Sequence, residues 1–282
     1  MPGLESVRRR LSSIAKPSSE PSSTPPSHTE LDTRLLDPNF FHIEDDDRHW
    51  FARVNIAVRT AMTKLHTISH DYMHVQRVAV SAFSLYLDEK HQPWTREIDP
   101  RTIVVAAMVH EIGAIRYALD HAENEKDFGP RSPDSPDKVQ TIQHDLVFEF
   151  LRRLDCPPDV AGPAALMASL VSFTREMQDK EKIFEHCEAY PALKFVLDAD
   201  RLDGLGFVGI ARLGAFGSVH AGRSSDTILS MVHLIDKRCV HYVGLMKTKG
   251  GKKEAEKRWA QMLEFRDGLV SQTNCSAGLR SD

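Results

Sequence analysis

Apolar residues recur every three or four positions along most of the chain from about Phe51 onward. This spacing places them on one face of a helix and is the main sequence signal for amphipathic α-helices. No segment shows the sustained alternation of apolar and polar residues that a strand needs. We therefore predict one all-α domain over 46–272, with helices near 51–62, 75–86, 100–114, 139–154, 160–173, 190–205, 227–245 and 253–270.

The first part of the chain lacks this periodicity. Residues 16–30 read KPSSEPSSTPPSHTE, a composition that cannot bury enough apolar surface to offset the entropy lost on ordering. We predict a disordered leader at 1–45 and a flexible tail at 273–282. The stretch LESVRRRLSSIAK at 4–16 has the Arg and Ser content of a mitochondrial transit peptide, but its short helical part and the prolines after it favour a solvated tail.

The chain has 282 residues, a formal net charge of -4, 14 histidines and four cysteines. The mild acidic balance argues against a protein that coats nucleic acid. The longest apolar run, Ile103 to Val109, is far shorter than the about 20 residues of a membrane span. The cysteines form no CxxC pair, which favours a reducing, cytoplasmic location, although a nuclear or mitochondrial one stays open. Histidine is the commonest metal ligand, so its abundance directs attention to metal binding.

Two stretches place histidines next to an apolar helical pattern. His74 stands about one turn into a helix that Ser69 can cap, where its side chain points either toward a metal ion or into the core. His110 and Glu111 end a long apolar helix just before Gly113. An imidazole and a carboxylate at such a helix end can converge on a divalent ion, or they can form a polar helix end with Gly113 as its cap.

A third stretch carries three acids within six residues of an apolar helix: Asp198, Asp200 and Asp203. Aspartate is poor in a helix interior and costly to bury without a partner. Asp198 and Asp200 cannot both be solvated if this helix is central. We therefore expect one of these two to meet a cation, either a metal ion or an arginine.

The order of His, His-acid and Asp on successive helices resembles the HD-domain superfamily of metal-dependent phosphohydrolases, in particular its small single-domain hydrolases from bacteria and fungi. The resemblance covers about 52–272, and its first and fourth stretches are long enough to be specific. The stretches that carry it are SHDYMHVQRV (69–78), HEIGAIRY (110–117), LVSF (170–173), LDADRLDGLGFVGIAR (197–212) and KTKGGKKEAEKR (247–258).

This resemblance implies an all-α HD fold with one bound divalent metal ion: Mn, Fe, Co, Ni, Zn or Mg. By position in the motifs, the implied metal ligands are His74, His110, Glu111 and Asp200, with Asp198 as the alternative to Asp200. The implied activity is hydrolysis of a phosphate ester or anhydride in a nucleotide or another small phosphorylated metabolite. No nucleic-acid polymer or membrane is expected as a partner, and an oligomer is compatible with the sequence but not indicated by it.

Further residues are candidates for contact with that substrate. His70 could protonate the leaving oxygen, since its i, i+4 relation to His74 places it at the same helix edge. A guanidinium binds phosphate bidentately or forms a structural ion pair instead, and three arginines are candidates: Arg77, Arg116 and Arg201. The pair His144-Asp145 matches no motif and is expected at the surface, while the basic loop at 220–223 could meet a phosphate or be a plain surface loop.

The chain departs from the superfamily pattern around its second motif. The usual doublet is His-Asp, whereas Glu111 adds one methylene, which shifts the carboxylate oxygens by about 1.5 Å. Ala114 stands where an aspartate is usual, and Arg116 stands where a lysine is usual. Two alternatives therefore stay open: an HD-fold enzyme of different chemistry, such as a hydratase, lyase or oxygenase, and a degenerate HD protein that binds a ligand without turnover.

Overall fold

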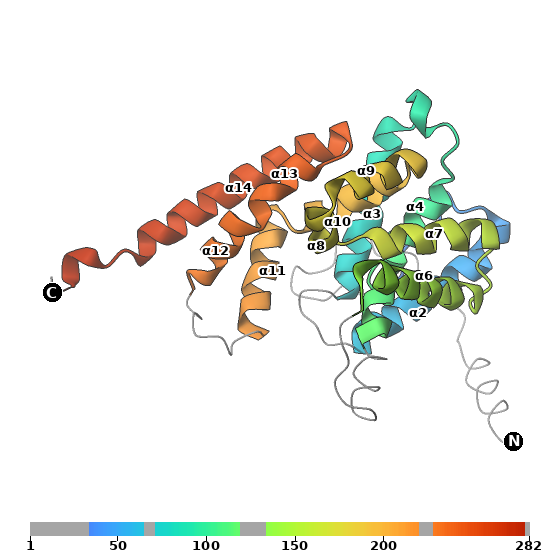
Figure 1. Ribbon diagram of the computed structural model, residues 1–282, viewed down its shortest axis with the longest axis horizontal. Coiled ribbons are helices and arrows are strands. Elements are labelled where there is room, and N and C mark those ends of the chain that lie inside the picture. Colours follow the sequence, from blue (N-terminus) through green and yellow to red (C-terminus); the bar gives the residue numbers. More distant parts are fainter. Residues whose placement is uncertain (1–33, 65–70, 119–133, 220–227, 280–282) are drawn as a thin grey trace, which may run out of the picture. The chain divides into compact units, whose positions relative to one another are not determined.

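The structure, a computed structural model, describes residues 34–64, 71–118, 134–219 and 228–279. Its elements are helical and these ranges contain no strand, which confirms the predicted all-α fold (Figure 1). Most of the predicted leader lies outside the described residues, as do His70 and the loop at 220–223. Among the helices described, none is long and apolar enough to cross a membrane.

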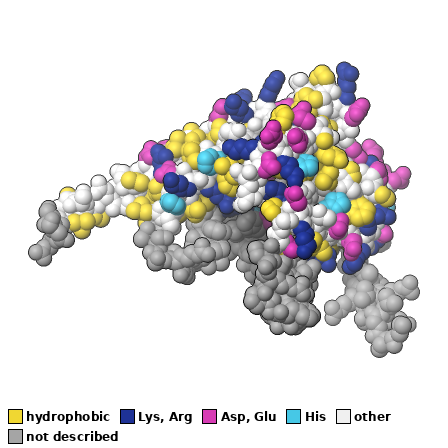
Figure 2. Space-filling model, in the orientation of Figure 1, with side chains coloured by type: hydrophobic (Ala, Val, Ile, Leu, Met, Phe, Trp, Pro, Cys, Tyr) yellow, Lys and Arg dark blue, Asp and Glu magenta, His cyan; other side chains and the backbone are white. Residues whose placement is uncertain are grey.

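The surface carries acidic and basic side chains next to one another, as the face in Figure 2 shows. Exposed ion pairs include Lys182 with Asp137 at 2.6 Å and Arg266 with Asp236 at 3.0 Å. This mixture agrees with the near balance of 36 basic and 40 acidic residues in the chain. Exposed pairs of this kind add little to stability, so the fold depends on its core.

The helices of the first part of the chain are α2 (Arg48–Lys64), α3 (Tyr72–Glu89), α4 (Pro100–Val109), α6 (Pro136–Arg152) and α7 (Pro158–Leu170), with single 3-10 turns η1 (Asp45–Asp47) and η2 (Pro93–Thr95). The later elements are α8 (Phe173–Gln178), α9 (Lys180–Ala189), α10 (Leu193–Asp203), α11 (Gly206–Val219), α12 (Ser230–Lys237), η3 (Cys239–His241), α13 (Tyr242–Leu245), α14 (Lys249–Thr273) and η4 (Ser276–Gly278).

Side-chain caps fix the starts of the helices that matter for the site. The Asp71 side chain accepts a hydrogen bond from the backbone N–H of His74 at 2.8 Å, so α3 begins with Asp71 as its cap in place of the predicted Ser69. Asp99 caps α4, whose first residue is Pro100, as the Asp-Pro pair predicts. A capped start holds the first turn of each helix in a defined position.

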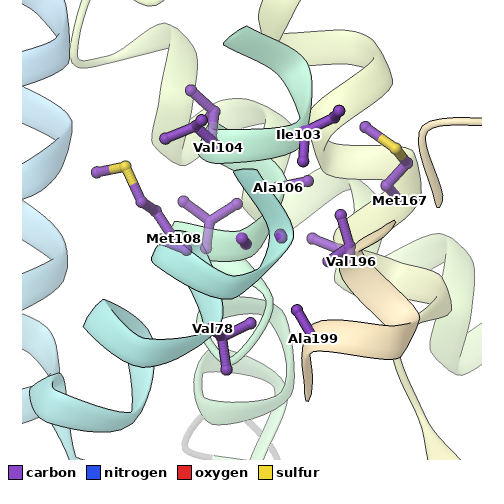
Figure 3. Packing of buried hydrophobic residues seen from close by; sticks show 14 of the residues in the cluster. Val78, Ile103, Val104, Ala106, Met108, Met167, Val196 and Ala199 are labelled. Carbon is purple, nitrogen blue, oxygen red and sulfur yellow. The ribbon is translucent and has the colours of Figure 1, made fainter. Parts of the chain in front are cut away.

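Helix α4 lies at the centre of the core. Every residue from Thr102 to Val109 is buried, and the helix packs against α3, α7 and α10. In Figure 3, Val78 of α3, Met167 of α7 and Val196 of α10 lie around it. A helix that is apolar on all sides is buried on all sides, so the residues that follow Val109 are held at a fixed point inside the fold.

The packed part of the chain begins before residue 46. Leu36, Phe41 and Ile43 are buried, and the Phe41 ring packs edge-on against Phe83 of α3 with 5.4 Å between centroids. These residues belong to the segment 1–45 that we predict as a leader, so that boundary is too late. The apolar residues of this short segment do not repeat at a helical period, and contacts with α3 hold them in place instead.

Two predicted helices are interrupted near the site. The helix predicted at 160–173 ends at Leu170, after which Val171 and Ser172 are extended and Ser172 caps α8. The helix predicted at 227–245 is divided into α12, η3 and α13. In both cases the apolar pattern continues across the break, so periodicity does not reveal it.

Candidate metal centre

The polar ends of three helices meet at one point. His74 lies in the first turn of α3, His110 follows the last residue of α4, and Asp200 lies in α10. They meet because α10 packs against both α3 and α4. One donor atom of each residue lies within 4.8 Å of the donor atoms of the other two. The structure thus brings together three of the four predicted metal ligands.

The distances among these donor atoms suit a single ion. His74 Nε2 is 3.1 Å from His110 Nε2 and 3.6 Å from Asp200 Oδ1, and His110 Nε2 is 3.8 Å from Asp200 Oδ1. Glu111, the fourth predicted ligand, places Oε1 at 3.7 Å and 3.5 Å from the two imidazole nitrogens. Two atoms that bind one ion at about 2.1 Å each cannot be more than about 4.2 Å apart, and each of these distances is shorter.

The end of α4 explains how two adjacent residues reach the same point. The helix ends at Val109, and His110 and Glu111 lie in the turn that follows. Within a helix their side chains would diverge by about 100°. Outside it, the longer glutamate side chain reaches both imidazoles, so the extra methylene does not remove the carboxylate from the centre.

The hydrogen bonds of the two histidines determine where their protons lie. His110 Nδ1 is 2.7 Å from the carbonyl oxygen of Ala107, and His74 Nδ1 is 2.7 Å from Asp203 Oδ2. Both partners accept hydrogen bonds, so each Nδ1 carries a proton and donates. In the neutral rings, the two Nε2 atoms then direct lone pairs toward each other across 3.1 Å. Such an arrangement is stable when a proton or a metal cation lies between them.

The charges around the two rings also favour a cation. Burial by itself would lower the pKa of His110, but the carboxylates of Glu111 and Asp200 and the carbonyl of Ala107 outweigh it and raise that pKa to about 9. A divalent ion would meet two imidazole nitrogens and two carboxylates here. This mixed nitrogen and oxygen set suits Mn, Fe, Co, Ni or Zn.

Asp203 supports His74 from behind and is a site residue that the sequence analysis did not identify. It is 4% exposed and accepts hydrogen bonds from His74 Nδ1 at 2.7 Å, from Arg77 Nε at 2.6 Å and from an Arg212 terminal nitrogen at 2.9 Å. Despite burial, the bonds from His74 and Arg77 hold the pKa of Asp203 well below its usual value. A carboxylate bound to the far nitrogen of a metal-ligating histidine fixes both its orientation and its tautomer.

Asp198, the alternative ligand, has a different role. Its fully buried carboxylate accepts hydrogen bonds from the backbone N–H groups of Lys247 and Thr248 and from the Thr248 hydroxyl, at 2.8 Å each for the shortest contacts. Burial raises its pKa to about 6 against the lowering effect of these bonds. Asp198 therefore anchors the start of α14, and the acid that lies with the histidines is Asp200.

Two of the three arginines predicted as phosphate ligands pair with buried acids. Arg77 binds both oxygens of Asp203, at 2.6 and 3.0 Å. Arg201, only 2% exposed, donates to Glu176 and to the carbonyl of Leu197, and burial lowers its pKa to about 10. Arg77 and Arg201 therefore form structural ion pairs, which is the second of the two roles that the sequence left open for them.

Three further predictions concern Arg116, His70 and the pair His144-Asp145. Arg116 is partly exposed on the helical stretch 112–118. His70, the predicted acid, lies outside the described residues, so its role stays a prediction. His144 pairs with the exposed Asp145 at 2.9 Å and is one-third exposed itself, in line with the surface position predicted for this pair.

A cavity of about 280 Å³ opens beside the centre, with Glu111 and Asp200 in its wall. Its other walls carry aromatic and basic side chains, chiefly Phe173, Tyr242, Arg212 and Arg238. Arg238 lies 4.8 Å from the centroid of the Phe173 ring and donates from Nε to the Tyr242 hydroxyl at 2.9 Å. None of these residues was selected as a candidate from the sequence, because they lie on α8, α11 and α13 and in the turn between α12 and η3, which approach the centre only in the folded chain.

The described part of the chain is thus all-helical and carries a histidine and carboxylate cluster whose spacing could hold a metal ion. Among solved structures, the chain resembles YpgQ from Bacillus subtilis in complex with ADP, with 23% sequence identity, a TM-score of 0.53, and coverage of 78% of this chain and 98% of that chain. A protein from Lactobacillus plantarum matches with 21% identity and a TM-score of 0.52, covering 78% of this chain and 96% of that chain.

An HD-superfamily hydrolase from Bacillus thuringiensis matches at 21% identity with a TM-score of 0.46, covering 79% of this chain and 99% of that chain. No protein-family model matches the chain, and no curated protein does. The two likenesses with TM-scores above 0.5 show that the chain shares the fold of these two proteins.

Proposed function

We propose that this protein is a metal-dependent phosphohydrolase of the HD type that acts on a nucleotide or another small phosphorylated metabolite. The observation that carries the proposal is the pair of buried imidazole nitrogens that face each other at 3.1 Å beside Glu111 and Asp200. Each ring donates from Nδ1 to a fixed acceptor. An arrangement that exposes two lone pairs to one point, ringed by carboxylates, is the chemistry of a divalent metal site.

The residues that would hold one divalent ion (Mn, Fe, Co, Ni, Zn or Mg) are His74, His110, Asp200 and Glu111. When bound, such an ion polarises phosphate oxygens and lowers the pKa of water, which are the two requirements for hydrolysis of a phosphate ester near neutral pH. The protein holds His74 through Asp203 and His110 through the Ala107 carbonyl, so neither ring has to reorient when the ion or the substrate binds.

The cavity beside the centre supports a phosphorylated substrate. Arg212 and Arg238 line it together with Glu111 and Asp200, so a ligand in the cavity would lie against both the guanidinium groups and the metal ligands. We assign phosphate contact to these two arginines in preference to Arg77 and Arg201. A nucleotide is favoured because the Phe173 and Tyr242 rings offer flat apolar surface in the same cavity, and because YpgQ, which has this fold, was solved with ADP.

The proposal can be tested with metal analysis and a phosphate-release screen. We expect purified protein to bind one divalent ion per chain and to release phosphate from nucleotides or sugar phosphates when Mn, Mg, Co or Ni is added. His110→Ala is expected to lose both the metal and the activity. His144→Ala, which alters an exposed histidine paired with Asp145, is the matched control and is expected to retain both.

Two outcomes would contradict the proposal in different ways. Full metal occupancy without phosphate release from any phosphorylated compound would favour an HD-fold enzyme of different chemistry. If the wild type binds no metal and His110→Ala behaves in the same way, the result would favour a degenerate protein that has lost its metal site through the changes at Glu111 and Ala114.

A cytoplasmic location remains a prediction from the unpaired cysteines, which fluorescence microscopy of the tagged full chain would check.

A further inference from the structure

A second cavity lies beside His110. It has a volume of about 200 Å³, and His110 and Ala114 lie in its wall. The larger cavity beside Glu111 and Asp200 shares the extended residues Val171 and Ser172 with it. The centre is thus bordered by one cavity on its carboxylate side and by another on its His110 side.

Arg175 of α8 lines this second cavity and has no acidic partner among the residues that the structure describes. Its terminal nitrogens donate to the carbonyl oxygens of Ser169 at 3.0 Å and Pro136 at 3.4 Å. Within the described ranges, no carboxylate oxygen lies within 4.0 Å of its guanidinium. The acid that acts on the charge of Arg175 from a longer distance is Asp137, whose carboxylate is paired with Lys182 at 2.6 Å. Burial accordingly lowers the pKa of Arg175, which marks a positive charge that is poorly compensated.

The other arginines around the centre differ in this respect. Arg77 and Arg212 share Asp203, and Arg201 has Glu176. A half-buried guanidinium that has only carbonyl partners retains the capacity to bind an anion strongly, because its charge is not yet balanced. Arg238 is the counterpart in the larger cavity, where its Nε donates to a tyrosine hydroxyl.

We propose that Arg175 forms a second oxyanion subsite, so that the ligand of this centre carries two anionic groups. One group would be the phosphate at the metal centre, and the other, a phosphate or a carboxylate, would lie in the cavity of His110 and Ala114 against the Arg175 guanidinium. This inference rests on the proposed function for the first group only. A guanidinium forms two parallel hydrogen bonds with either oxyanion, so the subsite selects a negatively charged group at a fixed distance from the centre.

Equilibrium binding to the metal-loaded protein tests this inference without requiring turnover. The probes are orthophosphate, which has one anionic group, inorganic triphosphate, and 3-phosphonopropionate, which joins a phosphonate to a carboxylate. Isothermal titration calorimetry would compare Arg175→Met with the wild type. We expect the variant to bind at least one of the two longer probes about ten- to a hundredfold more weakly, because it loses a charge-assisted contact. Orthophosphate affinity is expected to change less than threefold.

The two longer probes also distinguish the chemistry of the second group. A loss confined to triphosphate would assign a phosphate to the subsite, and a loss confined to 3-phosphonopropionate would assign a carboxylate. Arg153→Met removes an arginine that is 70% exposed and paired with Glu149, and it serves as the control for loss of charge. Gln143→Glu adds an acid to the same cavity with little change of shape, and it is expected to weaken binding of the same probe even if Arg175→Met folds poorly.

Equal affinities of wild type, Arg175→Met and Gln143→Glu for both longer probes would overturn the inference, as would a failure of the wild type to bind either of them more tightly than orthophosphate. A protein that binds these probes through Arg175 but hydrolyses no phosphate ester would contradict the proposed function and leave the subsite established.

Discussion

Replacing Asp203 with asparagine tests how the centre is held. Asp203 Oδ2 accepts from His74 Nδ1 and from Arg212, and Oδ1 accepts from Arg77 Nε. Asparagine keeps the shape but has one acceptor oxygen and two N–H donors. If the NH2 group of the asparagine faces Arg77, two hydrogen-bond donors face each other. If the NH2 group faces His74, the imidazole must carry its proton on Nε2 instead of Nδ1, which removes the lone pair that would bind the metal.

The magnitude follows from what each orientation loses. Loss of the partner behind a metal-ligating histidine weakens metal affinity by about ten- to a hundredfold, or about 1.4 to 2.7 kcal/mol. The metal-free protein also loses hydrogen bonds to a charged acceptor, which are worth about 1.5 to 3 kcal/mol each when intact. Arg77 is about one-third exposed, and solvent compensates part of this loss. We therefore expect the free energy of unfolding to fall by about 1 to 3 kcal/mol.

The assay is competition for Co²⁺ or Zn²⁺ against a chromophoric chelator, together with urea unfolding in EDTA. Asp236→Asn is the matched control, because it makes the same chemical change in an exposed ion pair with Arg266. We expect this control to bind metal like the wild type. If Asp203→Asn kept metal affinity within twofold of the control, the assignment of His74 as a ligand held through Asp203 would be wrong.

Other consequences of the structure are open to measurement. Burial would raise the pKa of Asp47, but hydrogen bonds from an indole and from Arg101 lower it, so its ionised form stabilises the fold above the unfolded-state pKa of about 3.9. Asp47→Asn is expected to lower the free energy of unfolding by about 1 to 3 kcal/mol at pH 7, and the difference from wild type is expected to shrink as the pH falls below about 4. A Cβ on Gly209 would lie 2.3 Å from a backbone carbonyl oxygen, whereas Gly268 has open space around it. Gly209→Ala is therefore expected to destabilise by about 1 to 3 kcal/mol or more and Gly268→Ala to stabilise by about 0.5 to 1 kcal/mol in urea unfolding. Divalent metal at a hundred times its dissociation constant is expected to stabilise the wild type by about 2.7 kcal/mol in thermal unfolding, and an equal gain in His110→Ala would contradict the metal assignment.

The helical fold could be predicted because its main signals are local. The apolar run from Ile103 to Val109 and the Asp99-Pro100 pair mark α4, and α4 is where the structure places the centre of the core. The short segment around Phe41 was not predicted to pack, because its contacts are with Phe83 of α3 and not with its own neighbours. Local patterns identify elements that bury their own periodic face, and they miss segments held by distant partners.

For the acids of α10, helical spacing alone could have predicted which of them lie on the same side of the helix. Residues three apart on a helix share a face, whereas residues two apart point to opposite sides. Asp200 and Asp203 are three apart, and both face His74, one as a prospective ligand and one as its support. Asp198 is two residues from Asp200 and faces the start of α14. Helical spacing thus excludes Asp198 and Asp200 from one site, but which of them meets the histidines depends on how α10 packs.

The arginines could not be assigned from the sequence, because proximity to a ligand along the chain does not determine what a guanidinium binds. Arg77 and Arg201 stand beside ligand motifs, yet both are balanced by acids on other helices, Asp203 and Glu176. Arg175 and Arg238 lie outside the quoted motifs, and their positive charges have no carboxylate at ion-pair distance among the residues described. Positive charge that the protein itself does not neutralise binds an anionic substrate most strongly. Arg175 and Arg238 are therefore expected to contribute most to its recognition, and Arg212, which is paired with Asp203, is an additional contact in the larger cavity.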